Sequence, residues 1–512
     1  MKRALYLSIA SFAVVAALAS CDKPAEPIVM EEPEVELPVI ELLSPEVESN
    51  INMAEVEKIE FSWTNVENVN SYKILLSLNE DMSKAVEIVA TKNPYEVKAE
   101  TMDAKLAALG IKYEAEKNLY WSVAVYGSQE NAAETQVRKI TIKRAPEKIV
   151  DPAERIADPL TVKVAILFED FEIPGTGGKK MHEVCALHAP GGYRINGGGW
   201  YDPAKLIKEY EEGLEKSSHG VVNYEVVKTV HADRFFTYFN DQISYDGTVK
   251  EYLTLDTLLY LFETRQVDNN TTYDYVGMMK YYGFDDMVDN GEISEVWVYS
   301  FPAGGMYESR MIGSGAFWCN SPGLGAEQGA PCENLCIVMG LNYERTADLA
   351  LHSCCHRVES IMAQVYENKG GHEGWNYKKK SSITDLTNWE KFSAHTLEYK
   401  KYEKNHAHIG MCHFPPNARQ DYDYDYSGGV YSYANTWYNY PDIKEENPIW
   451  VSCNTWKHQG GGQYGYLLWY YDHIPHFKGL CPRDGHLNNW WHYIVDYKGA
   501  MRQEQRLAAE FE

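Results

Sequence analysis

Residues 335–367 read LCIVMGLNYERTADLALHSCCHRVESIMAQVYE, an apolar run that leads directly into an amphipathic segment. The run Leu335–Gly340 has the composition of a buried strand, and the spacing predicts one helix over Leu341–Glu367. At ~100° per residue, a polar side about 80° wide carries Arg345, Asp348, His352, His356 and Glu359. The opposite side is apolar and carries Leu351, Cys354, Val358, Ile361, Met362 and Val365.

The polar side of this helix has the spacing of a metal site. His352 and His356 lie four residues apart, and Glu359 follows one turn later. Such a set can hold a metal ion or act as an acid–base pair. Ser353 stands where the usual zinc-protease motif has Glu, so that motif is absent. The alternative is a solvated helix face on which two residues are histidines.

A catalytic zinc ion takes three protein ligands and leaves a fourth position open for water. We expect His413 to supply the third ligand, with His406 and His408 as alternatives. The predicted cofactor is one divalent metal ion, with zinc favoured over calcium. The acids of residues 421–425 are spaced as in a calcium loop, but Tyr426 stands where that loop needs glycine. No phosphate-binding glycine motif occurs, so no nucleotide cofactor is predicted.

Apolar runs alternate with helix-length segments from residue 161 onward. The predicted strands are Val162–Phe168, Val221–Val230, Ser294–Phe301 and Leu335–Gly340, and the predicted helices before residue 335 are Pro203–Ser217, Val249–Arg265 and Tyr273–Asn290. This alternation predicts an α/β domain with a mainly parallel sheet over residues 161–512. The aromatic-rich last hundred residues are expected to form loops and short helices across one edge of the sheet.

Ligands of parallel sheets collect beyond the carboxyl ends of the strands. Glu308 and Arg310 follow one predicted strand, and Glu344 and Arg345 follow the next. We expect Glu359 or Glu344 to act as general base, and Glu308 and Arg310 to orient substrate. Arg345 is a further expected substrate-binding residue. Glu308 and Glu344 are also the two carboxylates that a glycosidase would offer.

The first 20 residues have the features of an export signal, with a basic start, an apolar core and small residues before a cysteine. Leu18-Ala19-Ser20-Cys21 resembles a bacterial lipobox, which implies cleavage before Cys21 and a lipid on its sulfur. Residues 21–41 are rich in Pro and Glu and are predicted to be an extended tether. We expect an outer-membrane lipoprotein, on the cell surface or the periplasmic face.

Net charge limits the possible partners, and the number of cysteines limits the possible disulfides. A formal net charge of −26 argues against nucleic acid, because so acidic a surface repels phosphates. Of the ten cysteines, those after Cys21 are odd in number and cannot all pair. Most of them are expected to be buried as small hydrophobic residues.

Short strand-like runs separated by turns fill residues 42–145, and a Pro- and charge-rich linker covers residues 146–160. This pattern predicts a small all-β sandwich, so the chain as a whole is predicted to be multidomain. Four stretches are the most characteristic, namely Leu43-Ser44-Pro45, Phe61-Ser62-Trp63, Tyr72–Ser77 and Tyr120–Val123. In them the segment resembles the N-terminal immunoglobulin- or fibronectin-III-like domain of SusE/SusF-type outer-membrane lipoproteins of Bacteroidetes. The resemblance implies a glycan-utilisation system, with glycan-uptake transporter components as partners.

The large domain resembles a widespread family of bacterial secreted proteins, from which no reaction can be carried over. The matching stretches are Glu295–Val298, Tyr307–Met311, Gly315–Pro322, Met339–Arg345, His356–Met362, Pro415–Asn417, Asp421–Asp423 and Leu487–Trp491. Asn320 and Asn417 lie in them and are expected to bind substrate. Relatives are expected to have an acidic residue where this chain has His352, which makes His356 and Glu359 the firmer candidates.

Together these features predict a metal-dependent hydrolase of a glycan or glycoconjugate. His352, His356 and His413 would hold the metal ion. Trp490 and Trp491 are expected to offer flat platforms to sugar rings, although aromatic side chains more often form core. Two other classes stay open, a non-catalytic surface glycan-binding protein and a secreted metallopeptidase.

Overall fold

The computed structural model of the protein describes residues 39–66, 69, 72–125, 134–146, 152–185, 200–244, 247–264, 270–302, 304–366, 386–396 and 407–511. The chain divides into two compact units. The described residues within 39–50, 59–97 and 118–141 form the first unit, and those within 51–58, 98–117 and 142–511 form the second. Cys21 and the rest of the predicted signal lie outside the described residues.

Short strands make up most of the N-terminal part of the chain. They are β1 (Val39–Ile40), β2 (Leu42–Ser44), β3 (Asn50–Asn52), β4 (Lys58–Trp63), β5 (Tyr72–Ser77), β6 (Val86–Ala90), β7 (Tyr95–Lys98), β8 (Glu116–Val125), β9 (Glu134–Thr135) and β10 (Arg138–Lys143). Two small sheets have the orders β3-β10-β8-β5-β6 and β2-β4-β7. Ile59, Phe61 and Trp63 alternate along β4 and are buried. The β-structure predicted for this segment is therefore confirmed, as small antiparallel sheets.

One helix, α1 (Ala99–Ala108), separates β7 from β8 in a segment for which the sequence predicted only β-structure. Its sequence AETMDAKLAA is rich in Ala, Glu and Lys, which have high intrinsic helix propensity. Met102 and Leu106, one turn apart, are its buried residues. Only two apolar positions mark its inner face, so a search for alternating residues passes over it.

The second unit is built on a five-stranded sheet. Its strands are β11 (Leu160–Phe168), β12 (Val222–His231), β15 (Glu295–Ser300), β16 (Ser309–Ile312) and β17 (Cys336–Asn342), in the order β12-β11-β15-β17-β16. The first four strands of this order are parallel, and the edge strand β16 is antiparallel. The predicted mainly parallel sheet is confirmed. Because β12 and β15 flank β11, the crevice between β11 and β15 is the switch point at which such folds bind ligands.

The remaining elements surround this sheet. The helices are α2 (Pro152–Arg155), α3 (Met181–Val184), α4 (Pro203–Ser217), α5 (Leu255–Thr264), α6 (Tyr275–Tyr282), α7 (Phe284–Asp289), α8 (Ala347–Val365), α9 (Asn388–Phe392), α11 (Gly462–Asp472), α12 (Trp490–Val495) and α13 (Tyr497–Phe511). The short strands are β13 (Thr237–Phe239), β14 (Thr271–Tyr273), β18 (Val430–Ser432), β19 (Ile449–Val451), β20 (His476–Leu480) and β21 (Leu487–Asn489). Within the described ranges, no helix has both the length and the apolar composition needed to cross a bilayer.

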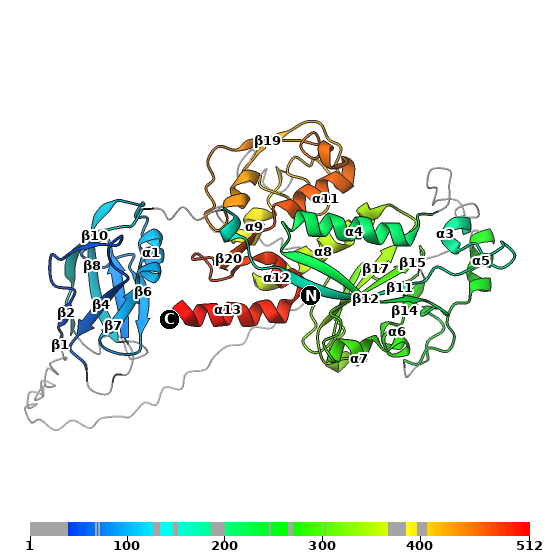
Figure 1. Cartoon of the computed structure of the whole chain (residues 1–512), viewed down its shortest axis with the longest axis horizontal. Coiled ribbons are helices and arrows are strands. Elements are labelled where there is room, and N and C mark those ends of the chain that lie inside the picture. The colour runs from blue at the N-terminus through cyan, green and yellow to red at the C-terminus, as the bar shows by residue number, and fades with distance from the viewer. Residues whose placement is uncertain are drawn as a thin grey trace, which may run out of the picture. The chain divides into compact units, whose positions relative to one another are not determined.

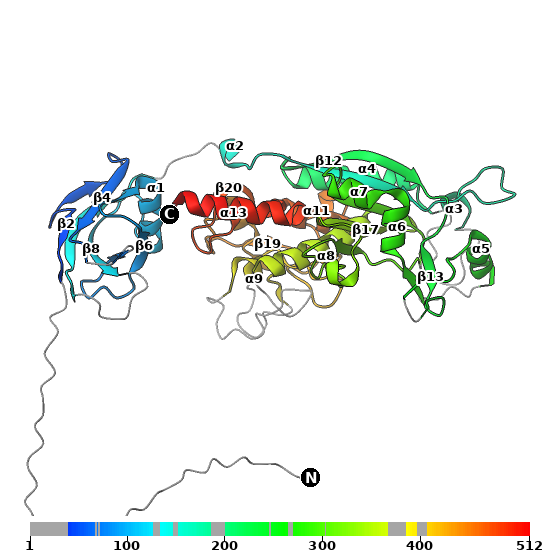
Figure 2. The same ribbon diagram turned by 90° about the horizontal axis from the view of Figure 1, so that it is seen from below.

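Helices cover both faces of the five-stranded sheet (Figures 1 and 2). α4 and α8 lie on one face and α6 and α7 on the other, while α11 packs against α4 and α8. Trp297 and Met339 point into the core shared with α4 and α8, whereas Val298 and Val338 point into the core shared with α6 and α7. Since both faces are buried, these strands read as continuous apolar runs.

Several predicted boundaries differ from the observed ones. β17 continues through Asn342, so α8 begins at Ala347 rather than at Leu341. The single helix predicted over Tyr273–Asn290 is two helices, α6 and α7. Gly283 separates them with a φ of +68°, a left-handed conformation that ends a helix and that glycine adopts without strain.

The cysteines after Cys21 are all free. Only Cys453 is partly exposed, and the others are buried, as the sequence predicted for most of them. Burial raises the pKa of the Cys336 thiol well above its usual value and also raises the pKa of Cys354. These thiols therefore behave as small apolar groups within the core.

A buried ion pair fixes α8 against the sheet. Arg357 donates from Nη2 to Glu295 Oε1 of β15 at 2.6 Å and to the carbonyl oxygen of Ile494 at 2.7 Å. The second oxygen of Glu295 accepts a hydrogen bond from Trp297 Nε1 at 2.9 Å. Both charged side chains are at most 1% exposed. Since each charged group has partners, α8 is held in one rotation about its axis.

Removing one partner of this pair is expected to destabilise the second unit strongly. R357M leaves the Glu295 carboxylate buried without its cation, which costs about 3–5 kcal/mol of the free energy of unfolding. The double variant E295L/R357M is expected to recover most of that loss, because no charge then remains buried. Urea denaturation of both variants and the parent measures the difference. A double variant less stable than R357M would contradict this account.

His473, which follows α11, is expected to make stability depend on pH. It is buried, its Nδ1 donates to the Trp469 carbonyl at 2.7 Å, and burial lowers its pKa to about 4. Between about pH 4 and 6.5 the unfolded chain binds a proton that the folded chain excludes. Stability therefore falls with falling pH across this window, by about 1.4 kcal/mol per pH unit for this group. Denaturation at several pH values should show a shallower slope for H473Q, and an unchanged slope would contradict the prediction.

Candidate metal centre

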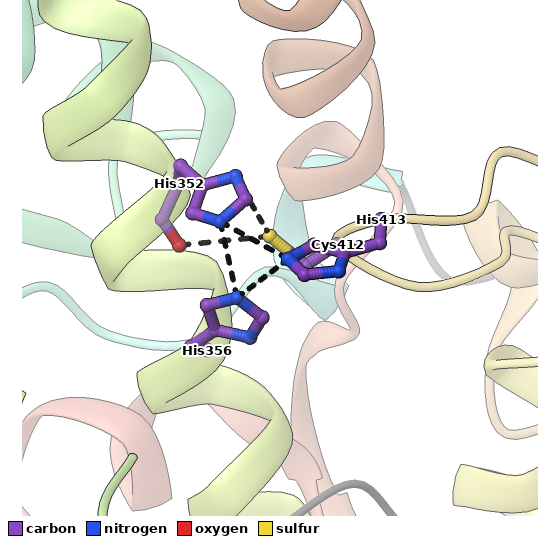
Figure 3. A group of neighbouring side chains, drawn as sticks. All are labelled: His352, His356, Cys412 and His413. Atoms are coloured by element: carbon purple, nitrogen blue, oxygen red, sulfur yellow. Dashed lines mark hydrogen bonds between the residues drawn. The ribbon is translucent and has the colours of Figure 1, made fainter. Parts of the chain in front are cut away.

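Three imidazoles converge between α8 and the segment that contains His413 (Figure 3). His352 and His356 lie one turn apart on α8. The Nε2 atoms are 3.1 Å apart for His352 and His356, 3.0 Å for His356 and His413, and 3.2 Å for His413 and His352. The three histidines that the sequence proposed as ligands are thus brought together.

The opposite nitrogens of two of these rings are held by carboxylates. His356 Nδ1 lies 2.8 Å from Glu359 Oε2, and His413 Nδ1 lies 3.0 Å from Asp421 Oδ1. Because ionised carboxylates only accept hydrogen bonds, these Nδ1 atoms carry the hydrogens. In the neutral rings the Nε2 atoms are then left with lone pairs that point to the centre of the cluster.

The third ring, His352, is the most enclosed. Its Nδ1 lies 3.4 Å from Cys412 Sγ. Burial, and then the neighbouring His356 and His413, lower its pKa to about 3, so the ring is neutral near pH 7. Neutral imidazole is the form that binds a metal ion. A hydrogen on His352 Nε2 can point to only one of the two lone pairs of His356 and His413, whereas a metal ion can bind all three nitrogens.

The cluster has the dimensions of a tetrahedral metal site. Zinc binds imidazole nitrogen at ~2.0–2.1 Å, so three ligands around a tetrahedral ion lie roughly 3.4 Å apart. The observed separations of 3.0–3.2 Å are only slightly shorter. The side chains of His356 and His413 are 12% and 21% exposed, so solvent reaches the cluster. The group can therefore hold a metal ion and leave one position for water.

Cys412 belongs to the same group, since one ligand atom from each of the four residues falls within 4.8 Å of the others. Its sulfur contacts His352 Nδ1, on the edge of that ring away from the other two histidines. Burial raises the pKa of the Cys412 thiol well above its usual value. A bound metal ion would still remove that proton, so the pKa does not decide whether the sulfur is a ligand. Because the sulfur contacts Nδ1 of His352 and not the three Nε2 atoms, we assign Cys412 to the support of His352, and the variant C412S tests this assignment.

Glu359 has a different role from the general base that the sequence predicts. Its Oε2 contacts His356, and its Oε1 accepts a hydrogen bond from the backbone nitrogen of Cys412 at 2.7 Å. The side chain is only 2% exposed. With both oxygens occupied, Glu359 orients one ligand and ties α8 to the segment that carries His413, as carboxylates around metal sites commonly do.

Glu308 is a carboxylate that could act as an acid or a base near the cluster. It precedes β16, and because this strand runs antiparallel its beginning lies at the carboxyl edge of the sheet. Asn320 Nδ2 donates to Glu308 Oε2 at 2.6 Å. Burial is the main cause that raises the pKa of Tyr422 and of Cys412, and the charge of Glu308 makes a smaller contribution in the same direction. Both of those residues contact the imidazoles, so Glu308 lies within electrostatic reach of the cluster.

A cavity of about 1100 Å³ opens at the same edge of the sheet. Glu308 and Arg310 form part of its wall, together with Leu349 and Ser353 from the turn of α8 that carries His352. Tyrosines and glycines supply much of the remaining wall, namely Tyr238, Tyr252, Tyr273, Tyr275, Tyr307, Gly247, Gly277, Gly304, Gly305 and Gly340. Two of the predicted site residues therefore share a cavity that reaches the turn of α8 carrying His352.

Glu344 and Arg345 do not line this cavity. Glu344 is buried, its Oε2 has no hydrogen-bond partner among the described residues, and its Oε1 lies 3.7 Å from Arg345 Nε. Burial raises the pKa of the Glu344 carboxyl group. Glu308 and Glu344 thus do not face one cavity as the paired carboxylates of a glycosidase would.

The two tryptophans predicted as sugar platforms belong to the core instead. Trp490 and Trp491 are both fully buried. The Trp490 ring packs against Trp437 at 5.6 Å and against Trp389 at 6.2 Å. Neither indole therefore offers a free face to a sugar. Burial of these large apolar rings instead stabilises the packing of the C-terminal segment.

Asn417 and His408 are also structural. Asn417 Nδ2 donates to the carbonyl oxygens of Tyr426 and Gly428 at 3.0 and 2.6 Å, which corrects its predicted contact with substrate. His408, an alternative third ligand, is fully buried and accepts a hydrogen bond from Trp437 Nε1. His406, the other alternative, lies outside the described residues.

The acids of residues 421–425 do not form a calcium site. Asp421 contacts His413, whereas Asp423 pairs with Arg419 at 2.9 Å. Two of the three alternating acids thus have separate partners. Asp421 instead becomes the residue that orients the third histidine, a role that its spacing alone did not indicate.

Tyr422 is a neighbour of the cluster that the sequence did not single out. Its ring centroid lies 4.2 Å from that of His413 and 5.9 Å from that of His352, and its side chain is half exposed. The residue has a φ of +58°, which is rare for a bulky side chain. Such backbone strain is concentrated at functional sites. A run of alternating Asp and Tyr has no periodicity that would mark one tyrosine.

No protein-family model, curated protein or solved structure matches this chain, so the interpretation of function depends on the site itself.

The purified protein is expected to hold about one zinc ion per chain, as three histidine ligands require. H356A removes the central ligand and is expected to lose the ion. E359Q keeps the ligand but weakens its orientation, and is expected to lower zinc affinity about 10- to 100-fold. Elemental analysis and competition with a chelating dye measure both effects.

C412S is the matched control for this experiment, because it alters the fourth member of the group while leaving three imidazoles. It is expected to retain zinc. If C412S lost the ion as completely as H356A, the sulfur would be a ligand and the site would be closed and structural.

Proposed function

We propose that the protein is a zinc-dependent hydrolase that acts on a glycan or glycoconjugate. The convergence of three Nε2 atoms from His352, His356 and His413 at 3.0–3.2 Å carries the proposal. Three histidine ligands with a fourth position open to solvent are typical of catalytic zinc sites, whereas structural sites use four protein ligands.

The protein groups around the cluster suit hydrolysis. A divalent ion at such a site lowers the pKa of water to near 7. Glu308 is our candidate for the general base that accepts the proton, since Asn320 holds Oε2 and the other oxygen has no hydrogen bond among the described residues. Arg310 lines the same cavity and would orient substrate. Tyr422 would cover one side of the reacting group.

The glycan part of the proposal is supported by the N-terminal region and by the cavity wall. Cys21 ends a lipobox-like sequence, and the β-rich segment resembles the immunoglobulin- or fibronectin-III-like domain of SusE/SusF-type lipoproteins. An outer-membrane lipoprotein working with glycan-uptake transporter components follows from these resemblances. The tyrosine-rich cavity wall offers the flat aromatic faces and polar groups on which sugar rings bind.

Loss of the proposed base is expected to abolish turnover without loss of zinc. E308Q removes the proton acceptor and is expected to lower kcat by about 100- to 10,000-fold, the usual contribution of general-base catalysis. The assay measures release of new reducing ends from a panel of polysaccharides and glycoproteins by the zinc-loaded protein. E510Q, in an exposed ion pair on α13, is the matched control and should keep full activity.

Three outcomes would contradict the proposal. Cleavage of peptide bonds but not of glycans would make the protein a metallopeptidase. Tight binding of a glycan with no cleavage by the zinc-loaded protein would make it a binding protein. Full activity of both E308Q and H356A would show that neither Glu308 nor the histidine cluster takes part in catalysis.

A further inference from the structure

Arg310 presents its guanidinium group to the cavity. The side chain lines the cavity wall, and its Nε donates a hydrogen bond to the carbonyl oxygen of Pro322 at 3.2 Å. No carboxylate in the described part of the chain lies within ion-pair distance of it. Its Nη1 and Nη2 atoms, the pair that can grip two oxygens at once, therefore remain available.

Aromatic rings hold this guanidinium group in place. Its Cζ atom lies 4.8 Å from the ring centroid of Tyr275 and 5.6 Å from that of Tyr307. The Tyr275 hydroxyl accepts a hydrogen bond from the backbone nitrogen of Tyr307 at 2.8 Å, which fixes the two rings relative to each other. Contact with ring faces orients a cation without neutralising it. Arg310 therefore keeps its full charge for a ligand.

The two carboxylates that line the same cavity have hydrogen-bond donors other than Arg310. Asp274 accepts from the Tyr252 hydroxyl at 2.6 Å with one oxygen and from the backbone nitrogen of Gly277 at 2.8 Å with the other. Glu308 accepts from Asn320 at 2.6 Å. Neither is paired with Arg310, so the cavity has separate basic and acidic positions.

Buried arginines of this acidic chain have carboxylate partners. Arg357 pairs with Glu295 and Arg144 pairs with Asp103, and these are the two buried arginines among the described residues. A guanidinium group held between rings and kept from acids is arranged for an anion that comes from outside.

We infer that the cavity binds an acidic sugar, whose carboxylate is held by Nη1 and Nη2 of Arg310. The inference rests on the proposed hydrolase function and names its substrate class, a glycan that contains uronic acid. The planar fork of arginine matches the two oxygens of a carboxylate. Because the protein as a whole repels polyanions, short oligosaccharides and chain ends are the forms that enter.

Calorimetric titration tests this inference with three tetrasaccharides of equal length. One contains hexuronic acid, the second is its carboxyl-reduced neutral counterpart, and the third is neutral but sulfated. The uronic acid tetrasaccharide is expected to bind best. R310Q is expected to weaken its binding roughly 10- to 100-fold, the usual loss when a hydrogen bond to a charged group is removed. R310K keeps the charge but not the fork and should also bind less tightly than the parent.

R506Q is the matched control, because Arg506 lies in an exposed pair with Glu510 on α13. Equal binding of the acidic and carboxyl-reduced tetrasaccharides would overturn the inference. So would unaltered binding by R310Q. Preference for the sulfated tetrasaccharide would overturn the assignment of a carboxylate ligand.

The same titrations with H356A separate this inference from the proposed function. If H356A loses zinc and activity but still prefers the uronic acid tetrasaccharide, both ideas stand. If the parent holds no zinc but shows the Arg310-dependent preference, the hydrolase proposal fails and acidic sugar recognition remains. If the parent cleaves glycans without regard to their carboxylates, the inference fails alone.

Discussion

The geometry of the second unit depends on the ion pair between Arg357 and Glu295. It joins the middle of α8 to the start of β15 in a buried position, where an unpaired charge would be far more costly than a pair. Arg357 follows His356 directly, so fixing one side chain also fixes the direction of the next. The pair thus turns α8 so that its two histidines face the segment that contributes the third.

Glu359, on the same polar side of α8 as the two histidines, completes this arrangement. By accepting hydrogen bonds from both His356 and the backbone of Cys412, it joins ligands that are far apart in sequence. These contacts hold His356 and the segment that carries His413 in place. A metal ion bound by the three imidazoles would add to the stability of the fold, because the unfolded chain lacks the assembled site.

Much of the second unit was predictable from local patterns, and the errors at the candidate site share one cause. Strand β17, the helix after it and the spacing of His352 and His356 follow from apolar periodicity, and His413 was the expected third ligand. Periodicity cannot tell what packs against a polar side. The polar side of α8 is covered by a distant segment, so Glu359 is an orienting group rather than a base. Trp490 and Trp491 were read as surface platforms for the same reason.

The buried thiols have a consequence for how the second unit can be observed. The pKa of Cys336 and Cys412 is raised well above the ordinary value, and electrophiles react with thiolate. A thiol-labelling reagent would therefore modify these sites only during transient openings of the core, while the partly exposed Cys453 supplies a fast internal standard. The labelling rates of the native cysteines would therefore report the rate of local unfolding without any engineered probe.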